Sequence, residues 1–436
     1  MKIQNTNHGE MGTFLVLWIT QSFSELGSAM TSFALIIWLY GQSGSALSTA
    51  LLSVCSYAPY ILLSIFAGAL SDTWNKKTTM LVCDSLAALG TVVLLILLET
   101  GQLQPWHLYV INALNGTMNT VQQPASEVAI TLITPRKYYQ KISGLKAFSN
   151  ALVTVLTPML ATALLTLVNL QAVIFVDLLT FLTAFFTLLF LIRIPEHDQE
   201  EKNKTHSVLQ SAREGIDYLR QHQGILDLIL FLAAINLTAS IYNAALPAMF
   251  LSRSGAGKTV FGLVTMCTGL ATLLGSLVAS LLPEPKSRVR TIWMALFFSM
   301  STENFFLAFG KTTPLWCTGA ILGWLAIPVM STNLEALMRL YIPVEMQGRV
   351  YAARNTLQFF TIPVGYLLGG FLVDKVFEPF AATQTSNQLF LLAFGSGKGS
   401  GAAFLFAVIG FIGVVTCLVF RKDRHIWKLE EDHISL

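Results

Sequence analysis

The stretch "GALSDTWNKKTTM", residues 68–80, concentrates one acid and two lysines in a short hinge between two long apolar runs. Charge gathered at such a hinge is typical of a loop that leaves a membrane between two spanning helices, because hydrocarbon solvates neither charges nor free backbone groups. The same pattern in a soluble protein would need a large polar surface elsewhere in the chain. The composition of the whole chain distinguishes these two cases.

The composition indicates that the solvent of this chain is mostly lipid. Of its 436 residues, 54% are hydrophobic and 12% are charged, whereas a soluble domain carries about 25% charged residues. The net charge of +3 and the absence of a basic patch argue against a nucleic-acid partner. The cysteines lie in apolar runs without metal-ligand spacing, which predicts buried free thiols, no metal and no cofactor: Cys55, Cys83, Cys267, Cys317 and Cys417.

Apolar runs of about 20 residues, the length that crosses a bilayer as a helix, recur along the whole chain. The first, from Met11 to Tyr40, is too long for the core of a signal peptide and is interpreted as a span. Twelve spans are predicted, beginning near Met11, Ala46, Thr78, Pro105, Ala147, Gln171, Ile225, Val260, Thr291, Pro314, Asn355 and Gly401.

The basic residues predict the orientation of these spans. With the N-terminus inside, all but five of the 27 lysines and arginines fall in cytoplasmic segments. The five in outer loops are Arg253, Lys258, Lys311, Lys375 and Lys398. Because cytoplasmic loops carry an excess of Lys and Arg, both termini are predicted to be cytoplasmic.

The longest inner loop divides the chain into halves. It runs from Pro195 to Gly224, and its second part spaces Val208, Leu209, Ile216 and Leu219 like an amphipathic helix on the membrane face that ends at Gly224. We therefore expect a six-helix bundle over 1–194, a linker over 195–224, a second bundle over 225–420 and a tail over 421–436.

The two halves share a short repeat at the ends of the fourth and tenth spans. Glu127 stands eight residues before Pro135, and Glu335 stands eight before Pro343. The basic residues that follow at matching distances are Lys141 and Lys146 in the first half, and Arg349 and Arg354 in the second. Related halves of six spans each are an architecture of secondary transporters, which place the substrate between the repeats.

These features resemble the major facilitator superfamily and, within it, the drug:proton antiporters of the macrolide-efflux type. The residues that carry the resemblance are "GALSDTWNKK", "WITQSFSELGSAMTSFALIIWLY", "EGIDYLRQHQGILDLIL" and "IPVEMQGRVYAARN". The resemblance implies an all-α membrane protein with twelve transmembrane helices in two pseudo-symmetric six-helix bundles, a monomer in the bacterial inner membrane. Of the antiporter motif in the fifth span, however, only Pro158 is kept, which puts the direction of transport in question.

The opening stretch corresponds to the superfamily's loop between spans two and three. The resemblance implies that this loop closes a cytoplasmic gate against span eleven, through Gly68, Asp72, Lys76, Lys77 and Arg349. Three positions depart from the signature: Thr73 replaces a basic residue, Asn75 a glycine and Lys76 an arginine. Asparagine tolerates a left-handed turn, so a left-handed turn is expected at Asn75. The alternative is a charge cluster that fixes topology and has no gating role.

Acids within the spans are functional candidates, because a carboxylate at midplane costs about 2.5–3.5 kcal/mol on insertion scales. Glu25 is the first candidate for carrying a proton; alternatively, the hydroxyls of Ser22, Ser24 and Ser28 satisfy it as a structural acid. Glu127 and Glu335 are further candidates, with ion pairing to loop lysines or arginines as the alternative. The resemblance implies that spans one, four, seven and ten line the cavity, where Gln21, Gln122, Asn236, Tyr242 and Asn243 could add polar contacts or join helices.

Structural roles as caps or pairs are favoured for Asp84 and Asp227, and no role is assigned to Asp177 or Glu303. The segment "RSGAGKT", residues 253–259, lacks the first glycine of a nucleotide-binding loop and is rejected as an ATP site.

The sequence thus predicts a secondary transporter that exports amphipathic drugs such as macrolides in exchange for protons, with small molecules, protons and lipid as its partners. An exporter of a siderophore or other endogenous metabolite, or a lysophospholipid flippase of the same fold, shares these features. An enzyme is not expected, because no nucleophile or metal cluster is apparent, and a receptor would not need a repeated gate.

Overall fold

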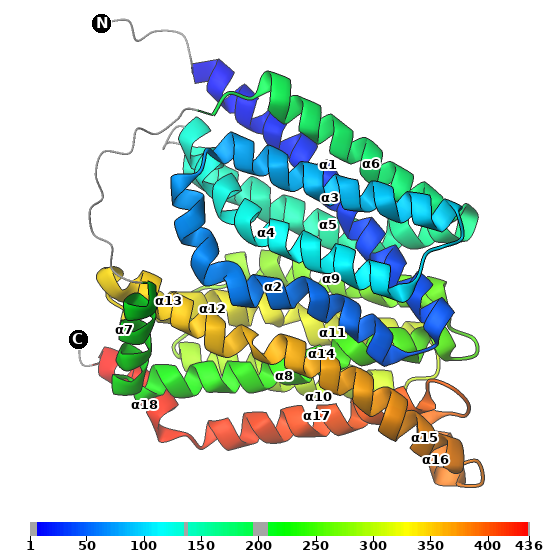
Figure 1. Cartoon of the computed structure of the whole chain (residues 1–436). Coiled ribbons are helices and arrows are strands. Elements are labelled where there is room, and N and C mark those ends of the chain that lie inside the picture. The colour runs from blue at the N-terminus through cyan, green and yellow to red at the C-terminus, as the bar shows by residue number, and fades with distance from the viewer. Residues whose placement is uncertain (1–6, 135–137, 195–207, 435–436) are drawn as a thin grey trace, which may run out of the picture. The chain divides into compact units, whose positions relative to one another are not determined.

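The computed structural model describes residues 7–134, 138–194 and 208–434, and it is helical throughout, without strands in these ranges (Figure 1). The helices before the linker are α1 (Asn7–Ser43), α2 (Ala46–Thr73), α3 (Lys76–Glu99), α4 (Pro105–Ile133), α5 (Tyr139–Leu167) and α6 (Leu170–Phe186), which continues into the π-helical η2 (Thr187–Leu191). The predicted all-α fold is confirmed.

The linker and the second half contribute shorter pieces as well as full-length helices. They are α7 (Val208–Gln221), α8 (Gln223–Ser252), α9 (Lys258–Leu281), α10 (Arg288–Phe309), α11 (Thr313–Leu325), α12 (Ile327–Tyr341), α13 (Val344–Phe359), α14 (Thr361–Phe371), η3 (Leu372–Phe377), α15 (Glu378–Thr383), α16 (Gln388–Phe394), α17 (Ser400–Arg421) and α18 (Arg424–Ile434).

Within the described ranges, eleven helical stretches are long and apolar enough to cross a membrane. The predicted span that begins at Pro105 forms α4, whose 29 residues reach about 44 Å at 1.5 Å per residue. Its amides reduce its apolar character: Asn112, Asn115, Asn119, Gln122 and Gln123. Each of the twelve predicted spans therefore corresponds to helix in the structure, and α4 is the one that is not among the eleven.

The chain forms two compact units. Unit 1 contains Met1–Trp38 and Cys55–Thr205, and unit 2 contains Leu39–Val54 and His206–Leu436. In unit 1, α3 packs against α4 and α6, and α5 packs against α6. One apolar core of this unit is built on Phe14, Met80 and Leu188, all nearly fully buried.

The first turns of α2 belong to unit 2, and a carboxylate of η3 caps them. Asp374 accepts hydrogen bonds from the backbone N–H groups of Ala46 (2.9 Å) and Leu47 (2.9 Å) and from the Ser45 hydroxyl (2.6 Å). An anion is favoured there because the first N–H groups of a helix have no partner within it. Gly370 makes the approach possible, since a Cβ at this position would lie 2.6 Å from the Cα of Leu47.

Helix α10 is enclosed by glycine-bearing faces of two neighbours. On α11, a Cβ added at Gly319 would lie 2.4 Å from the Cβ of Phe306, and a Cβ added at Gly323 would lie 2.4 Å from the Cβ of Glu303. From the other neighbour, α17, Gly410 approaches Asn304. Small residues allow helices to approach closely in lipid, where packing rather than the hydrophobic effect drives association.

The predicted tenth span is a broken helix. Its first part, α11, ends at Leu325, and α12 begins at Ile327 with Pro328 in its first turn. Proline has no N–H to donate to the preceding turn, so the helix is interrupted at this place. Interrupted helices are a recurring feature of substrate sites in transporters.

The linker forms the predicted amphipathic helix, but its end differs from the expectation. Helix α7 ends at Gln221, and Gly224 lies inside α8. A Cβ at Gly224 would lie 2.6 Å from the carbonyl oxygen of His425, so this glycine permits α18 to pack against α8 and does not end α7.

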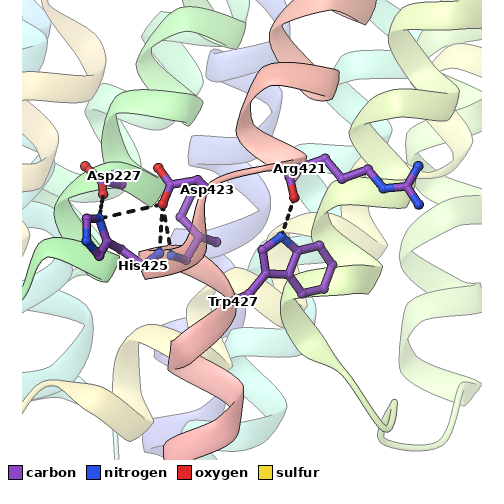
Figure 2. Close-up of polar contacts among 6 residues, drawn as sticks. Asp227, Arg421, Asp423, His425 and Trp427 are labelled. Carbon is purple, nitrogen blue, oxygen red and sulfur yellow. Dashed lines mark hydrogen bonds and ion pairs between the residues drawn. The ribbon is translucent and has the colours of Figure 1, made fainter.

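Figure 2 shows how the junction of α17 and α18 is fixed to α8. The ring Nδ1 of His425 lies 3.0 Å from Oδ2 of Asp227, and Asp423 accepts from the backbone N–H of His425 at 2.8 Å. The indole of Trp427 donates to the carbonyl of Arg421 at 2.7 Å. Asp227 thus has the structural pairing role expected from the sequence.

Candidate functional site

Unit 2 contains a cavity of about 330 Å³, large enough for a small organic molecule. Its wall comes from α8, α10, α11, α12 and α13 and is mostly apolar, with Leu232, Ile235, Met300, Ile327, Met330 and Leu334 among its residues. The polar groups on the wall include Asn236, Tyr242, Glu303, Asn304, Trp324, Glu335, Arg354 and Gln358. An apolar wall with a few polar groups is the usual composition of a ligand site.

Glu303 is the most deeply buried carboxyl group on this wall. Only 5% of the residue is exposed. Its Oε1 accepts hydrogen bonds from the Tyr242 hydroxyl at 2.5 Å and from the Trp324 indole at 2.8 Å. Both donors are neutral, so they orient the carboxyl group without compensating the charge it carries when ionised.

The local sequence explains why Glu303 and Trp324 meet. Gly323 precedes Trp324 at the end of α11, and a Cβ there would lie 2.6 Å from Oε2 of Glu303. Together with Gly319 it forms a G-x-x-x-G pattern on the face of α11 that contacts α10. The pattern brings the two helix backbones together, and the break after Leu325 leaves Trp324 in the last turn of α11.

A second polar group on the wall is an ion pair with its own supports. Arg354 Nη1 lies 2.8 Å from Oε1 of Glu335, and its Nε donates to Gln358 at 3.1 Å. The amide of Asn236 donates to the backbone carbonyl of Gln358 at 3.3 Å. The arginine side chain is 11% exposed, and a charge so buried needs partners of this kind.

The charges on this wall do not balance. The charged groups that line the cavity are Glu303, Glu335 and Arg354. Since Arg354 pairs with Glu335, an ionised Glu303 gives the wall one negative charge in excess. Protonation of Glu303 or a bound cation would remove this excess.

Unit 1 contains a smaller cavity, of about 110 Å³. It is lined by α1, α4 and α5, and its residues include Gln21, Glu25 and Lys146. The ammonium of Lys146 forms an ion pair with Glu127 and acts electrostatically on Glu25. As in unit 2, the basic residue on the cavity wall is paired with one glutamate while a second carboxyl group lines the cavity.

The two ion pairs occupy matching positions in the repeat predicted from the sequence. Lys146 follows Glu127 by 19 residues, and Arg354 follows Glu335 by 19 residues. For both glutamates, the ion pair with a basic residue, which the sequence left as the alternative, is the arrangement observed. The pair of unit 2 is the less exposed one. The side chains of Arg354 and Glu335 are 11% and 46% exposed, whereas those of Lys146 and Glu127 are 31% and 60% exposed.

The hydroxyls near Glu25 bind other partners. Ser28 donates to Asp177 at 2.9 Å, and Ser22 shares a hydrogen bond with Ser149 at 2.7 Å. The idea that these two serines satisfy Glu25 is therefore wrong. Asp177, left without a role, is a buried acceptor between α6 and α1.

Two predicted polar residues lie outside the described cavity walls. The side chain of Gln122 donates to Asp84 at 2.5 Å, which joins α4 to α3 and gives Asp84 the structural role expected for it. Asn243 donates to the carbonyl of Ala239 in its own helix. Neither is among the residues that line the two cavities.

The predicted gate residues are only partly described. The surroundings of Gly68 and the side chain of Asp72 lie outside the described part of the structure. Lys77 donates to the carbonyls of Leu189 (2.9 Å) and Ile192 (2.7 Å) at the end of η2, and Lys76 donates to the carbonyl of Trp74.

The expected left-handed turn at Asn75 is wrong. Asn75 has φ −61° and ψ 120° and caps α3, its side chain accepting from the N–H of Thr78 at 3.0 Å. Asparagine is among the best N-cap residues, which explains why it is accommodated here without a left-handed backbone.

Arg349 is held by the linker helix. Its Nη1 lies 2.5 Å from Oε2 of Glu214 on α7, and a Cβ at Gly215 would lie 2.4 Å from its carbonyl oxygen. The start of α13, where the resemblance places the gate, is thus bound to the linker helix α7 by an ion pair and a close backbone contact.

One group of possible metal ligands occurs in the described residues: Asp227, Asp423 and His425, with ligand atoms within 4.8 Å of one another. Their atoms are used in the hydrogen bonds drawn in Figure 2, since His425 pairs with Asp227 and Asp423 caps α18. The cluster is therefore explained as a structural joint.

Sequence reasoning missed Glu303 and Trp324 as cavity residues. The signals were present: Glu303 is a single acid within an apolar span, and the G-x-x-x-G pattern of α11 precedes Trp324 directly. What was lacking was the helix pairing, since the resemblance directed attention to spans one, four, seven and ten.

The comparisons with known proteins agree with this architecture. Residues 10–397 match the model of the family described as transmembrane secretion effector. Macrolide efflux protein A of Streptococcus pyogenes is 23% identical over 366 residues, covering 83% of this chain and 90% of that protein. The protein of the same name from Enterococcus faecalis is 23% identical and covers 74% of this chain and 99% of its own length.

Among solved structures, a mutant of the nucleoside transporter NupG superposes with a TM-score of 0.71 at 13% identity. The match covers 94% of this chain and 99% of NupG, and it concerns the fold alone. Since the family model covers most of the sequence and the fold agrees, the chain belongs to the transmembrane secretion effector family of the major facilitator superfamily and is a multi-pass membrane transporter.

Proposed function

We propose that the protein exports amphipathic drugs such as macrolides by alternating access, driven by proton entry, in a bacterial inner membrane with both termini cytoplasmic. The observation that carries this proposal is the repeated charge pattern, in which each unit has a cavity lined by a carboxyl group, Glu25 or Glu303, and by a basic side chain that is already paired with another glutamate. Such a wall favours exchange between a proton and another positively charged or proton-bearing species. The 23% identity to macrolide efflux protein A supports the drug as substrate.

In this proposal Glu25 takes up the external proton. It lines the cavity of unit 1, where the one basic side chain on the wall, Lys146, is already paired with Glu127. Glu127 and Glu335, which form ion pairs with Lys146 and Arg354, are the alternatives to Glu25 in this role. The drug leaves as the proton enters, and the loop around Asp72 then opens the inner side.

The experiment compares drug transport in everted vesicles and in cells. Expression in an efflux-deficient bacterium should raise the macrolide concentration needed to stop growth. In everted vesicles, an acidic interior should drive macrolide uptake, and a protonophore should abolish it. If the unmodified protein gives no macrolide uptake and no resistance, the drug-export proposal is wrong.

The role of Glu25 is tested with matched variants. Glu25→Gln should lose proton-driven uptake while drug binding remains, because the amide keeps the size of the side chain and removes the proton. Glu99→Gln removes an acid at the exposed end of α3 and should transport normally. Unchanged proton-driven uptake by Glu25→Gln would show that another group carries the proton.

A further inference from the structure

Two residues on the cavity wall of unit 2 have a side-chain oxygen that lacks a donor in the described structure. Both donors to Glu303, Tyr242 and Trp324, reach Oε1, and none of the described residues donates to Oε2. The side-chain oxygen of Asn304, a residue that is 3% exposed, is also without a partner in the described part. Both residues lie on the cavity wall. Oε2 of Glu303 is therefore open to a hydrogen-bond donor of a molecule bound in the cavity.

The charge of the wall narrows the choice of donor. Arg354, the basic residue on the wall, is engaged by Glu335 and Gln358, so it is not available to Glu303. A ligand that both donates hydrogen bonds and carries one positive charge satisfies Oε2 and cancels the excess negative charge of the wall. A protonated amine has both properties.

The remaining wall favours an organic body over a bare inorganic cation. Small metal cations prefer several oxygen ligands, whereas most of this wall is aliphatic, aromatic or thioether. Trp324 and Tyr242 stand beside the carboxyl group, and aromatic side chains attract organic cations through their π faces. The volume of about 330 Å³ admits a body of a few fused rings.

We propose that unit 2 contains a binding subsite for protonated amphipathic amines, in which Glu303 accepts the ammonium hydrogens and Tyr242 and Trp324 hold its carboxyl group in position. This subsite rests on the proposed export of amphipathic drugs and assigns the recognition of the cationic head group to helices α8, α10 and α11. It is separate from Glu25, which lies in the other unit.

The test uses two fluorescent probes with the same aromatic body, 1-pyrenemethylamine, which is protonated at neutral pH, and neutral 1-pyrenemethanol. Binding to the purified protein in nanodiscs is measured by fluorescence anisotropy, with empty nanodiscs subtracted. Glu303→Gln should weaken amine binding by about tenfold or more, equivalent to about 1.4 kcal/mol, and leave alcohol binding unchanged. Glu303→Asp, which keeps the charge, should retain part of the amine affinity.

Two controls separate the subsite from general effects. Glu284→Gln removes one negative charge from a side chain that is 89% exposed and should leave amine binding unchanged. In the unmodified protein, dicyclohexylcarbodiimide should label Glu303, as detected by peptide mass spectrometry, and saturating 1-pyrenemethylamine should protect it. This second measurement does not depend on whether a variant folds.

The outcomes distinguish the subsite from the wider function. Equal amine affinity of Glu303→Gln and the unmodified protein, or labelling that the amine does not reduce, overturns the subsite while macrolide export can still be observed in vesicles. Absence of amine binding to the unmodified protein also overturns it, and water would then be the occupant of the cavity. Loss of macrolide export with amine binding intact contradicts the proposed function and leaves the subsite supported.

Discussion

At Gly323 the absence of a side chain sets the position of a functional carboxyl group. A methyl group there would lie 2.4 Å from Cβ of Glu303, closer than packed carbon atoms approach. We expect Gly323→Ala to lower the free energy of unfolding by about 1–3 kcal/mol, as overpacking does, and to move Glu303 away from Tyr242 and Trp324. Amine binding should fall by at least about tenfold, measured with the pyrene probes.

Gly319→Ala is the matched control for this prediction. Its added Cβ would meet Phe306 on the same face of α10, at the same distance of 2.4 Å. The variant should lose comparable stability in a thermal scan while keeping more of its amine affinity than Gly323→Ala. An equal loss of binding in both variants would mean that general loosening of the α10–α11 contact, and not the position of Glu303, governs the site.

At the same scale, the ion pairs show what a sequence can and cannot determine. The matched spacing of Glu127 and Glu335 from the basic residues that follow them was visible in the sequence, and the structure makes both pairs. The sequence could not say whether these glutamates were free or paired, because that depends on the direction of side chains from two helices. Glu303 was overlooked for the same reason, since its partners lie 61 and 21 positions away along the chain.

At the scale of elements, two carboxylates that follow α14, Asp374 in η3 and Glu378 in α15, each cap the first turn of another helix within unit 2. Asp374 caps α2, and Glu378 accepts from the backbone N–H groups of Gly399 and Ala402 at 3.0 Å each, at the start of α17. Asp374→Ala should therefore speed amide hydrogen exchange in the first turn of α2 by about fivefold, since an N-cap contributes about 1 kcal/mol. The first turn of α17 should be unaffected.

Glu378→Ala provides the reciprocal control. It should speed exchange at the start of α17 and leave the start of α2 protected, as followed by mass spectrometry of the intact protein in nanodiscs. If either variant sped exchange equally at the starts of both helices, the caps would not act locally. The packing of residues 39–54 within unit 2 would then depend on other contacts.

The elements themselves were largely predictable, and their interruptions were not. Each of the twelve spans predicted from apolar runs corresponds to helix, because a chain that crosses hydrocarbon as a helix needs a minimum length. The break between α11 and α12 was not predicted, although Pro328 marks it, because a proline in a long apolar run can also bend a helix without ending it. The end of α7 was misplaced by reading Gly224 as a helix stop, whereas its small size serves the contact with α18.

At the scale of the whole molecule, the proposed amine subsite predicts a link between substrate recognition and proton movement. A protonated amine needs Glu303 in its ionised form, so an amine that binds to the protonated carboxyl group must release a proton. Amine affinity should therefore rise with pH until Glu303 is ionised in the free protein, by up to about tenfold per pH unit for one exchanged proton. The alcohol probe carries no charge, and its affinity should not vary with pH.

The measurement is the dissociation constant of 1-pyrenemethylamine from about pH 5.5 to pH 8, a range in which the primary amine stays protonated. In weakly buffered solution, binding at the lower end should release about one proton per amine bound, by the same linkage. Glu303→Gln should abolish both the pH dependence and the proton release, while Glu25→Gln, in the other unit, should keep both. Affinity that does not change with pH in the unmodified protein would separate amine recognition from proton exchange and assign coupling to Glu25 alone.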